Sequence, residues 1–465
     1  MIAVRRSIQS ISSLRDKRAV VVGLGLSGIA ACRLLASRGA KVIATDSKPA
    51  DSVSADVSAL AGEGVELVLG GHEAARMSDA DLIVVSPGVP SFRELMEADR
   101  AGVPIWGEVE LAVRAMNEAA AAAGRKKPRL VAVGGTNGKS TVTSLVAALL
   151  ERAGVPTFVG GNLGEPLAAH ADEPFDAVVL EVSSFQMERV DAFHPEVCVL
   201  LNVTQDHLDR YASEAAYADA KGNAFLKQTV TDLAIVPAGD DVCVAQARRG
   251  KGRVVTFGPG GSVDVHADAI VDHRARTTYP RGKLGLAGGH NALNVAAAVA
   301  AIGPFGLDPL VISEVLEGFR GLPHRMALVR ELDGVRYYDD SKGTNVGASV
   351  TAVRGVIEPK VVLIAGGRDK GGSYEPLADA LREKGRAVVL IGEASDLIDR
   401  AVGGVVPVRR AGSMEEAVRI AAELAKTGDA VLLSPACSSF DMFRDYKHRG
   451  DAFVAATLEL RRRSA

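Results

Sequence analysis

Residues 130–152 read LVAVGGTNGKSTVTSLVAALLER and predict a strand, a glycine-rich loop and a helix in succession. Backbone N–H groups of such a loop can hold phosphates, Lys139 can reach the β and γ oxygens, and Ser140 or Thr141 can bind Mg²⁺. The loop is a variant of the P-loop, because a valine stands where the consensus has its first glycine. The stretch predicts an ATP-binding α/β domain. Its candidate nucleotide-binding residues are Gly134, Gly135, Thr136, Asn137, Gly138, Lys139, Ser140 and Thr141.

The whole chain has the length and composition of a folded protein with several domains. Its 465 residues suggest about three domains, and 47% hydrophobic with 24% charged residues is ordinary for globular proteins. A net charge of −3 provides no general field for nucleic acid or an anionic membrane, so local groups must hold any anionic ligand. The four cysteines lack the spacing of a metal site or a disulfide framework and fit a reducing cytoplasm. The mostly apolar stretch at residues 19–36 contains Arg33 and three glycines, so we expect neither a membrane span nor a secretory leader.

Strands and helices alternate along the chain in three successive units. The expected strands are Ala19–Val22, Lys41–Thr45, Leu82–Val85, Leu130–Val133, Ala177–Leu180, Val197–Val203, Val361–Ala365, Ala387–Ile391 and Ala430–Leu433, and the expected helices include Ile29–Ala36, Gly107–Asn117 and Val142–Arg152. The predicted fold class is α/β, with three domains in series. We expect a Rossmann-like domain at residues 1–106, a central P-loop ATPase-type domain at 107–321, and a second Rossmann-like domain at 322–465.

A second glycine-rich motif lies near the amino terminus. Residues 23–28 read GLGLSG between a strand and a helix, and Asp46 ends the following strand. The glycines let backbone N–H groups and the helix start approach a diphosphate. The motif alone does not separate NAD from another nucleotide diphosphate, and a tight turn that needs small residues is the simpler alternative.

Two further side chains are candidates for a metal site. Glu181 and His207 follow predicted strands of the central unit, and the carboxyl ends of parallel strands meet at the ligand crevice. A carboxylate and a neutral imidazole there can bind a divalent ion that bridges phosphate and acceptor. Lys221, taken by itself, is interpreted as a surface lysine on a helix.

Six motifs in order along the chain resemble the Mur ligases. They are GGTNGKST at 134–141, EVSSFQ at 181–186, NVTQDHLDRY at 202–211, GLPHR at 321–325, DSKGTN at 340–345 and LSPACSSFD at 433–441. They span all three units. The GLGLSG and SPACSSFD segments favour the members of this family that use D-glutamate.

The resemblance implies a reaction and its partners. Such enzymes transfer the γ-phosphoryl group of ATP to the carboxylate of UDP-N-acetylmuramoyl-L-alanine, and D-glutamate then attacks the acyl phosphate. The implied cofactors are ATP and two Mg²⁺ ions. The implied place is the cytoplasm, in peptidoglycan precursor synthesis, with no nucleic acid partner and a monomeric protein. We expect Lys139 and Mg²⁺ to stabilise the transferring group.

The resemblance also assigns residues. Lys139, His207 and Lys221 are the implied catalytic residues, and Ser140, Glu181, His207 and Lys221, the last as a carbamate, are the implied metal ligands. Asn294, Arg325 and Asp340 are assigned to ATP. Leu26, Ser27, Ser47, Lys48, Gly88, Asn162 and His207 are assigned to the UDP substrate. Lys342, Thr344, Lys370, Ser439 and Tyr446 are assigned to D-glutamate, with Tyr446 standing where the family pattern has Phe.

Three alternatives remain open at this point. An NAD(P)-dependent oxidoreductase would explain GLGLSG and Asp46 but leaves the second site unexplained. A related ligase, such as one of the folylpolyglutamate synthase type, would share the ATP site but lack a uridine-binding first unit. A nucleotide-binding regulator without enzymatic activity would show no phosphate release that depends on D-glutamate.

Overall fold

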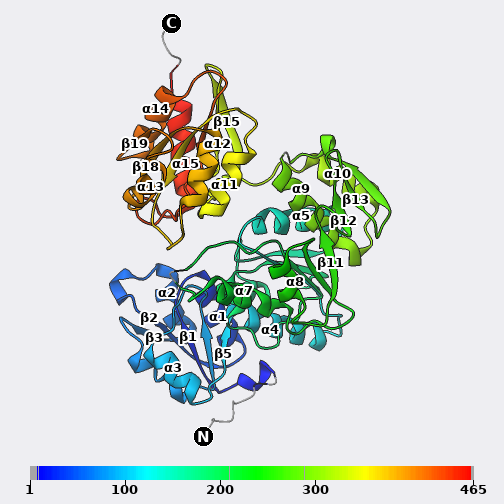
Figure 1. Ribbon diagram of the computed structural model, residues 1–465. Coiled ribbons are helices and arrows are strands. Elements are labelled where there is room, and N and C mark those ends of the chain that lie inside the picture. Colours follow the sequence, from blue (N-terminus) through cyan, green and yellow to red (C-terminus); the bar gives the residue numbers. More distant parts are fainter. Residues whose placement is uncertain (1–7, 9, 209, 287, 462–465) are drawn as a thin grey trace.

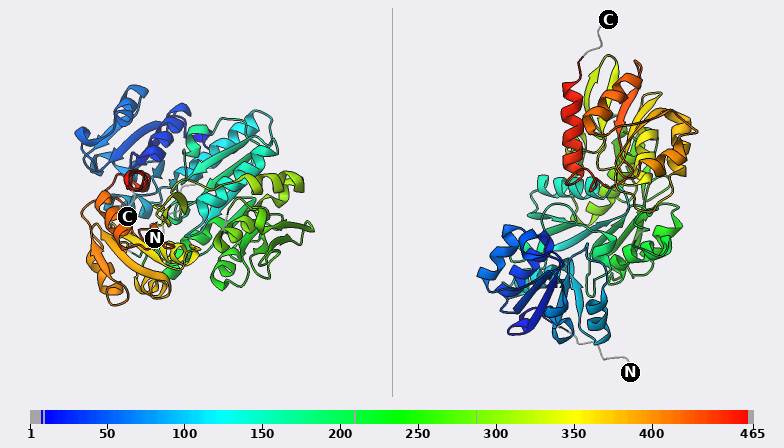
Figure 2. Two further views of the ribbon diagram at one scale, coloured as in Figure 1. Left: turned by 90° about the horizontal axis from the view of Figure 1, so that it is seen from above. Right: turned by 90° about the vertical axis from the view of Figure 1, so that its left-hand side faces the viewer.

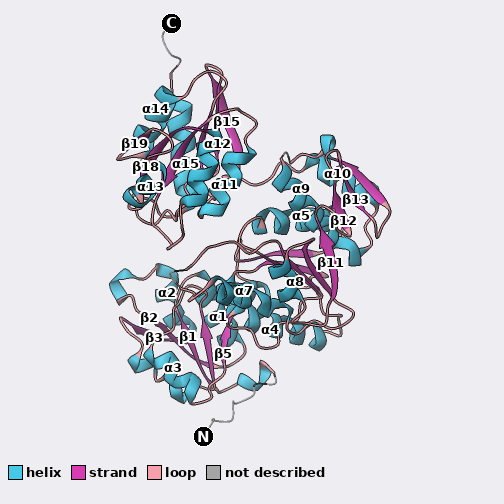
Figure 3. Cartoon of the chain, in the orientation of Figure 1, coloured by secondary structure: helices cyan, strands magenta, loops and turns pink. Residues whose placement is uncertain are grey.

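The computed structural model describes residues 8, 10–208, 210–286 and 288–461, and it folds into three α/β domains in series. Each domain is built on one sheet of mostly parallel strands with helices packed against it (Figures 1 and 3). The carboxy-terminal domain lies at the top of Figure 1 and the amino-terminal domain at the bottom, and two further views are given in Figure 2. The predicted fold class is confirmed.

The amino-terminal domain has a five-stranded parallel sheet in the order β3-β2-β1-β4-β5. Its strands are β1 Arg18–Val22, β2 Lys41–Asp46, β3 Glu66–Leu69, β4 Leu82–Val85 and β5 Ile105–Gly107, and its helices are α1 Leu26–Ser37, α2 Ala55–Ala59 and α3 Arg93–Arg100. Helix α1 begins earlier than the expected Ile29, directly within the GLGLSG loop. A Cβ atom at Gly28 would lie 1.9 Å from the Gly23 carbonyl oxygen, so only glycine lets α1 approach β1 this closely.

The central domain contains a nine-stranded sheet in the order β14-β13-β12-β11-β10-β9-β6-β8-β7. The strands are β6 Arg129–Gly134, β7 Thr157–Gly161, β8 Ala177–Glu181, β9 Val197–Leu200, β10 Leu233–Pro237, β11 Arg253–Phe257, β12 Val263–Val265, β13 Ala269–Asp272 and β14 Thr277–Pro280. The helices are α4 Glu108–Ala122, α5 Lys139–Arg152, α6 Ser184–Met187, α7 Glu214–Gly222, α8 Asp241–Ala247, α9 Gly289–Ile302 and α10 Pro309–Gly318. Strands β12 to β14 pair antiparallel at one edge of the sheet.

Strand β9 is shorter than expected. The prediction of a strand to Val203 is wrong, because β9 ends at Leu200 opposite Gly134, where its partner β6 also ends. The next residue but one, Asn202, turns toward the P-loop. Its Oδ1 accepts hydrogen bonds from the N–H groups of Thr136 and Asn137, at 3.2 and 2.9 Å. The chain therefore braces the phosphate loop there instead of extending the sheet.

The carboxy-terminal domain has a six-stranded sheet in the order β15-β16-β20-β17-β18-β19. Its strands are β15 Ala327–Leu332, β16 Val335–Asp339, β17 Val361–Gly366, β18 Gly385–Ile391, β19 Val408–Arg410 and β20 Ala430–Leu433. Its helices are α11 Val346–Gly355, α12 Glu375–Lys384, α13 Ser395–Val402, α14 Met414–Leu424 and α15 Tyr446–Glu459. Two buried clusters, one on each face of this sheet, form its core.

The order of the strands shows where the ligand crevices of the central and carboxy-terminal sheets are expected. In the central sheet β6 lies between β8 and β9, so the loops after these three strands diverge at a topological switch point, where α/β sheets bind ligands. The P-loop follows β6. In the carboxy-terminal sheet β20 lies between β16 and β17 in the same way, and the DSKGTN and SPACSSFD motifs follow β16 and β20.

A buried carboxyl group lies at the junction of the first two domains and should make stability depend on pH. Glu108 begins α4 and is 1% exposed; its Oε1 accepts a hydrogen bond from Ala168 N at 2.7 Å, whereas its Oε2 has no partner among the described residues. Burial raises the pKa of Glu108 to about 7. The folded state therefore binds more protons than the unfolded state between the unfolded pKa of about 4.3 and the folded one, and stability falls as pH rises through this window.

We expect Glu108→Gln to remove this pH dependence. Relative to the variant, the wild type should lose roughly 3 kcal/mol of unfolding free energy between about pH 4.5 and 8, from about 1.4 kcal/mol per unit of pKa difference. Denaturant unfolding at several pH values measures the difference, with Glu66→Gln, at an exposed position of β3, as the control. Parallel pH profiles of wild type and Glu108→Gln would contradict the prediction.

Candidate functional site

The glycine-rich loop connects the end of β6 to the start of α5. Gly135 and Gly138 have φ angles of 140° and 85°, which side chains rarely adopt, so both positions require glycine. The Lys139 ammonium folds back over the loop and donates to the carbonyl oxygens of Gly135 and Thr136 at 3.0 and 2.8 Å. Burial lowers the pKa of Lys139, and the carboxylates of Glu181 and Asp206 oppose that effect. The loop thus holds the Lys139 cation against two of its own carbonyl oxygens.

The predicted acid Glu181 ends β8, next to the P-loop strand. Its Oε1 accepts a hydrogen bond from Asn162 Nδ2 at 2.7 Å, and Ser140 also hydrogen-bonds to it. Burial works against its charge, but Lys139 and these two donors outweigh burial and hold the pKa of Glu181 below its ordinary value. Its Oε2 is buried and has no hydrogen-bond partner among the described residues. A buried, ionised and incompletely satisfied carboxylate beside a serine hydroxyl is a donor set that fits Mg²⁺.

Helix α7 brings Lys221 to the same loop. Lys221 is 5% exposed, its Nζ donates to Gly135 O at 2.8 Å, and it lies 4.4 Å from the centroid of the Tyr217 ring. Burial, followed by the charge of Lys139, lowers the pKa of Lys221 well below its ordinary value. The interpretation of Lys221 as a surface lysine, taken in isolation, is wrong because α7 packs this face against the P-loop.

His207 lies on the loop that follows β9. Its backbone adopts φ 56°, its ring is 4.7 Å from that of Phe185, and its Nε2 is 3.7 Å from Asp206 Oδ2. Across the described parts of the chain no three His, Cys, Asp or Glu side chains gather as a metal centre. A metal site made from the predicted ligands would therefore depend on the Ser140 hydroxyl, on a modified Lys221 and on the phosphates themselves.

A cleft of about 460 Å³ opens between the central and carboxy-terminal domains. Its lining includes six of the residues predicted to contact ATP, namely Asn137, Gly138, Thr141, Asn294, Arg325 and Asp340. Arg325 Nη2 donates to Ser140 Oγ at 2.7 Å, which links the carboxy-terminal domain to the first residues of α5. Burial raises the pKa of Asp340 to about 7, although the Ser434 hydroxyl, at 2.7 Å, and Arg325 act in the other direction.

The sequence did not reveal part of this cleft. Phe257, Leu286, His290, Leu322 and Met326 also line it, and they come from three separate segments of the chain. Two of these side chains are rings and the others are flexible and apolar, so together they can enclose a flat heterocycle. No local pattern predicts this lining, because only the packing of two domains brings the segments together.

The residues predicted for D-glutamate lie on the carboxy-terminal side. Lys342 Nζ is 3.9 Å from the Tyr446 ring centroid, so the ring holds this ammonium despite the departure from Phe. Burial and the charge of Arg325 lower the pKa of Lys342 to about 8. Thr344 donates its N–H to Lys342 O at 2.8 Å, and Ser439 is buried. Lys370 reaches the central domain, where its Nζ is 3.4 Å from Asp206 Oδ1.

The residues predicted for the UDP substrate divide between two domains. Most of them follow the carboxyl ends of β1, β2 and β4; these are Leu26, Ser27, Ser47, Lys48 and Gly88. The side chain of Leu26 is 72% exposed at the start of α1. Asn162 and His207 belong to the central domain, beside Glu181 and Asp206 respectively.

Asp46 has a structural use that weakens the oxidoreductase alternative. Its Oδ2 accepts a hydrogen bond from Leu24 N at 2.8 Å and its Oδ1 accepts one from Lys48 N at 2.9 Å. A carboxylate that selects NAD instead presents itself to ribose hydroxyls. Here it stabilises the glycine-rich loop and the turn after β2.

Comparison with known families agrees with this three-domain architecture. Residues 17–107 match the Mur ligase MurD-like, N-terminal domain, residues 133–302 match the Mur ligase middle domain, and residues 324–437 match the Mur ligase, glutamate ligase domain. The chain belongs to the Mur ligase family. The amino-terminal match is to the MurD-like kind of domain in particular.

Individual relatives extend over nearly the whole chain. The chain is 42% identical over 456 residues to UDP-N-acetylmuramoylalanine--D-glutamate ligase of Pelobacter propionicus, covering 96% of this chain and 100% of that protein. Among solved structures it is similar to UDP-N-acetylmuramate-alanine ligase MurC from Thermotoga maritima, with a TM-score of 0.58, 21% identity and coverage of 94% and 98% of the two chains. MurF ligase from Thermotoga maritima in complex with ADP gives a TM-score of 0.58, 17% identity and coverage of 90% and 94%. These two structures show the shared fold.

Proposed function

We propose that this protein is an ATP-dependent ligase that joins D-glutamate to UDP-N-acetylmuramoyl-L-alanine through an acyl phosphate, releasing ADP and phosphate. One observation carries the proposal: a P-loop cation, Lys139, and a buried carboxylate, Glu181, lie close enough to the carboxy-terminal lysine Lys342 for the three charges to influence one another beside the cleft. The full-length relative from Pelobacter propionicus supports the named substrates. No described helix has the length and apolar character to cross a bilayer.

The charge of the reactants explains the concentration of cations. A carboxylate is a poor electrophile, and phosphoryl transfer to it brings one anion onto another, so the site must neutralise both. Lys139 Nζ lies against the P-loop carbonyl oxygen of Gly135, and Arg325 of the carboxy-terminal domain contacts the hydroxyl of Ser140, which follows Lys139 in the chain. In the proposed mechanism they bind the transferring phosphoryl group, while Lys342 and Lys370 bind the carboxylates of D-glutamate. The amino group of D-glutamate then attacks the acyl carbon and the phosphate leaves.

Mg²⁺ would supply further positive charge on the phosphate oxygens. Glu181 and Ser140 would hold it at the P-loop, and the unsatisfied Glu181 Oε2 supports this. We propose His207 and a carbamylated Lys221 for a second ion. We propose that Asn294 and Asp340 orient the nucleoside of ATP. Asn294 packs directly against Gly138 of the P-loop.

We also propose a division of labour among the domains. Residues 1–106 bind the uridine nucleotide, residues 107–321 bind ATP, and residues 322–465 bring D-glutamate and complete the ATP site. Leu26, Ser27, Ser47, Lys48, Gly88 and Asn162 would contact the UDP substrate, and Thr344, Ser439 and Tyr446 would contact D-glutamate. The enzyme would act in the cytoplasm as a monomer.

Omission of single substrates tests this function. Orthophosphate release is measured with ATP, UDP-N-acetylmuramoyl-L-alanine, D-glutamate and Mg²⁺ together, and then with each left out. We expect full turnover only with all four present, and UDP alone should bind to the protein. Release that does not need D-glutamate, or that prefers another amino acid, would overturn the named acceptor. A failure to bind UDP would instead favour a ligase of the folylpolyglutamate type.

A further inference from the structure

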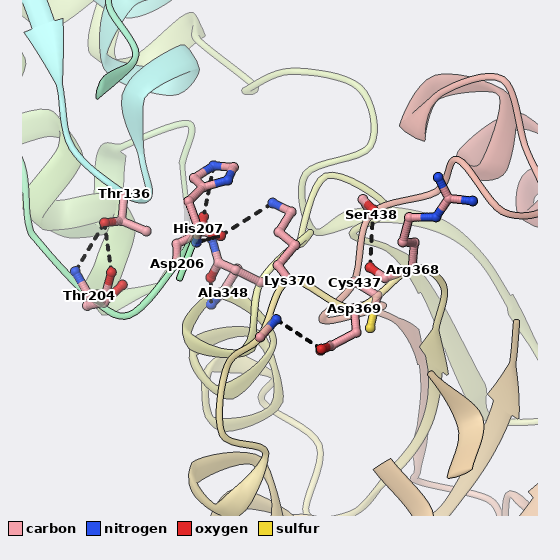
Figure 4. A network of polar contacts seen from close by, with 12 residues as sticks. Thr136, Thr204, Asp206, His207, Ala348, Arg368, Asp369, Lys370, Cys437 and Ser438 are labelled. Atoms are coloured by element: carbon pink, nitrogen blue, oxygen red, sulfur yellow. Dashed lines mark hydrogen bonds and ion pairs between the residues drawn. The ribbon is translucent and has the colours of Figure 1, made fainter. Parts of the chain in front are cut away.

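A small group of polar side chains joins the central domain to the carboxy-terminal domain beside the P-loop. Asp206, on the loop after β9, is 8% exposed. Its Oδ2 accepts a hydrogen bond from Asn345 Nδ2 at 3.2 Å, and its Oδ1 lies 3.4 Å from Lys370 Nζ. Figure 4 shows the Lys370 ammonium directed across to Asp206, next to His207. One buried carboxylate of the central domain therefore contacts two separate segments of the other domain.

The side chain of Asn345 uses its whole hydrogen-bonding capacity at this junction. Its Oδ1 accepts a hydrogen bond from Ala348 N at 2.8 Å and so caps the start of α11. Its Nδ2 donates both to Asp206 and to Asn137 Oδ1 of the P-loop, the latter at 3.1 Å. An amide nitrogen has two protons to donate, so neither is left over. The first turn of α11 is thereby fixed against the phosphate loop.

The segment that carries Lys370 has a second attachment to the same loop. Gln205, which precedes Asp206, accepts a hydrogen bond through its Oε1 from Ser373 N at 3.1 Å. Lys370 and Ser373 both lie in the irregular connection between β17 and α12. Two adjacent residues of the central domain thus contact the same carboxy-terminal loop.

Asp206 lies among cations, so two possible roles predict opposite effects of its removal on the binding of anionic substrates. Burial lowers the pKa of Lys139, with Lys370 among the cations that add to this effect, while Asp206 opposes it. If Asp206 served only to balance charge, its removal would leave a more positive site that binds anionic substrates more tightly. If Asp206 serves to place Lys370, its removal would leave that lysine unplaced, and binding of an anionic substrate would weaken.

We propose that Asp206 is a positioning residue that sets Lys370 and the first turn of α11 over the P-loop, so that an arriving amino-acid carboxylate meets a cation already in place. This inference rests on the proposed function, in which Lys370 binds D-glutamate. It assigns to Asp206 no contact with the reacting atoms. Asp206 also accepts a hydrogen bond from His207 N at 3.0 Å, but its proposed effect on amino-acid binding is transmitted through Lys370 and Asn345.

The steady-state constants of Asp206→Asn test the proposal. We expect the KM for D-glutamate to rise at least about tenfold, with kcat changed by about threefold or less and the KM for ATP within about twofold. In an Asp206→Asn background, Lys370→Met should raise the KM for D-glutamate by a smaller factor than it does in the wild type, because the two side chains act as a unit. Asp219→Asn is the matched control, since this carboxylate of α7 is 64% exposed and its contacts are with Gln246 and Arg249 of its own domain.

A second variant covers the case in which Asp206→Asn does not fold. Asn345→Asp keeps a residue that caps α11 well but sets a carboxylate against Asp206, so it should raise the same KM. An unchanged or lowered KM for D-glutamate in a folded variant, or simply additive effects with Lys370→Met, would overturn the positioning role. Loss of D-glutamate dependence in the wild type itself would instead overturn the proposed function, which keeps the two failures apart.

Discussion

Replacement of Lys139 by alanine is expected to lower ATP-dependent phosphate release at least about a thousandfold, because catalysis of phosphoryl transfer depends mainly on electrostatic stabilisation of the transferring group. The ammonium lies at 3.0 and 2.8 Å from two carbonyl oxygens of its own loop, in the position from which it can turn to a bound phosphate. Neither Arg325 nor Lys342 can replace it, because both come from the carboxy-terminal domain and approach the cleft from the other side.

The fold should tolerate this change. The hydrogen bonds of the Lys139 side chain to the described residues stay within the loop, and truncation leaves the Asn202 brace intact. Thermal unfolding of Lys139→Ala should therefore lie within a few degrees of the wild type, and UDP binding to the first domain should persist. Lys283→Ala, at a side chain 67% exposed in the central domain, is the control. A Lys139→Ala protein that releases phosphate at the wild-type rate would exclude the loop as the ATP site.

The sequence predicts local structure here far better than contacts between domains. The P-loop could be predicted because glycines with positive φ, a lysine and a helix start lie within eight consecutive residues. The burial of Lys221 could not be predicted in isolation, since its helix has little amphipathic contrast and only the packing of α7 on Gly135 buries it. The resemblance of the whole chain to a family indicated what the isolated residue did not.

The same limit applies to the interdomain contacts. Asp206 and Asn345 lie within recognised motifs, but the motifs do not say that these two side chains meet across 139 positions of sequence. Asn202 also lies in one of the motifs. Because the predicted strand continued past it, the sequence did not show that Asn202 turns toward the P-loop. A β-rich run such as 197–203 carries no signal for the point at which its partner strand ends.

Replacement of Lys221 by alanine is the second change with a large expected effect. We expect turnover to fall at least about a hundredfold, as it does when a group that stabilises transition-state charge is removed. Burial and the charge of Lys139 lower the pKa of Lys221 well below its ordinary value, which favours the uncharged amine. An uncharged amine attacks CO₂, forming an N–C bond and releasing one proton, and the resulting carbamate is an anion. Beside the carboxylates of Asp206 and Glu181, such an anion would be stabilised by a bound Mg²⁺ ion.

Chemical rescue distinguishes a carbamylated Lys221 from a Lys221 side chain that only fills space. A short-chain carboxylate such as acetate, added to Lys221→Ala, should restore activity by at least about fivefold, since it can occupy the space and supply the missing charge. Removal of dissolved CO₂ should lower wild-type activity reversibly, and ¹³C-labelled bicarbonate should give a carbamate resonance that Lys221→Ala lacks. Lys227→Ala, at an exposed position of the same domain, should respond to none of these treatments. A fully active wild type with no carbamate resonance would show that Lys221 works as an unmodified lysine, hydrogen-bonded to Gly135 O as in the structure.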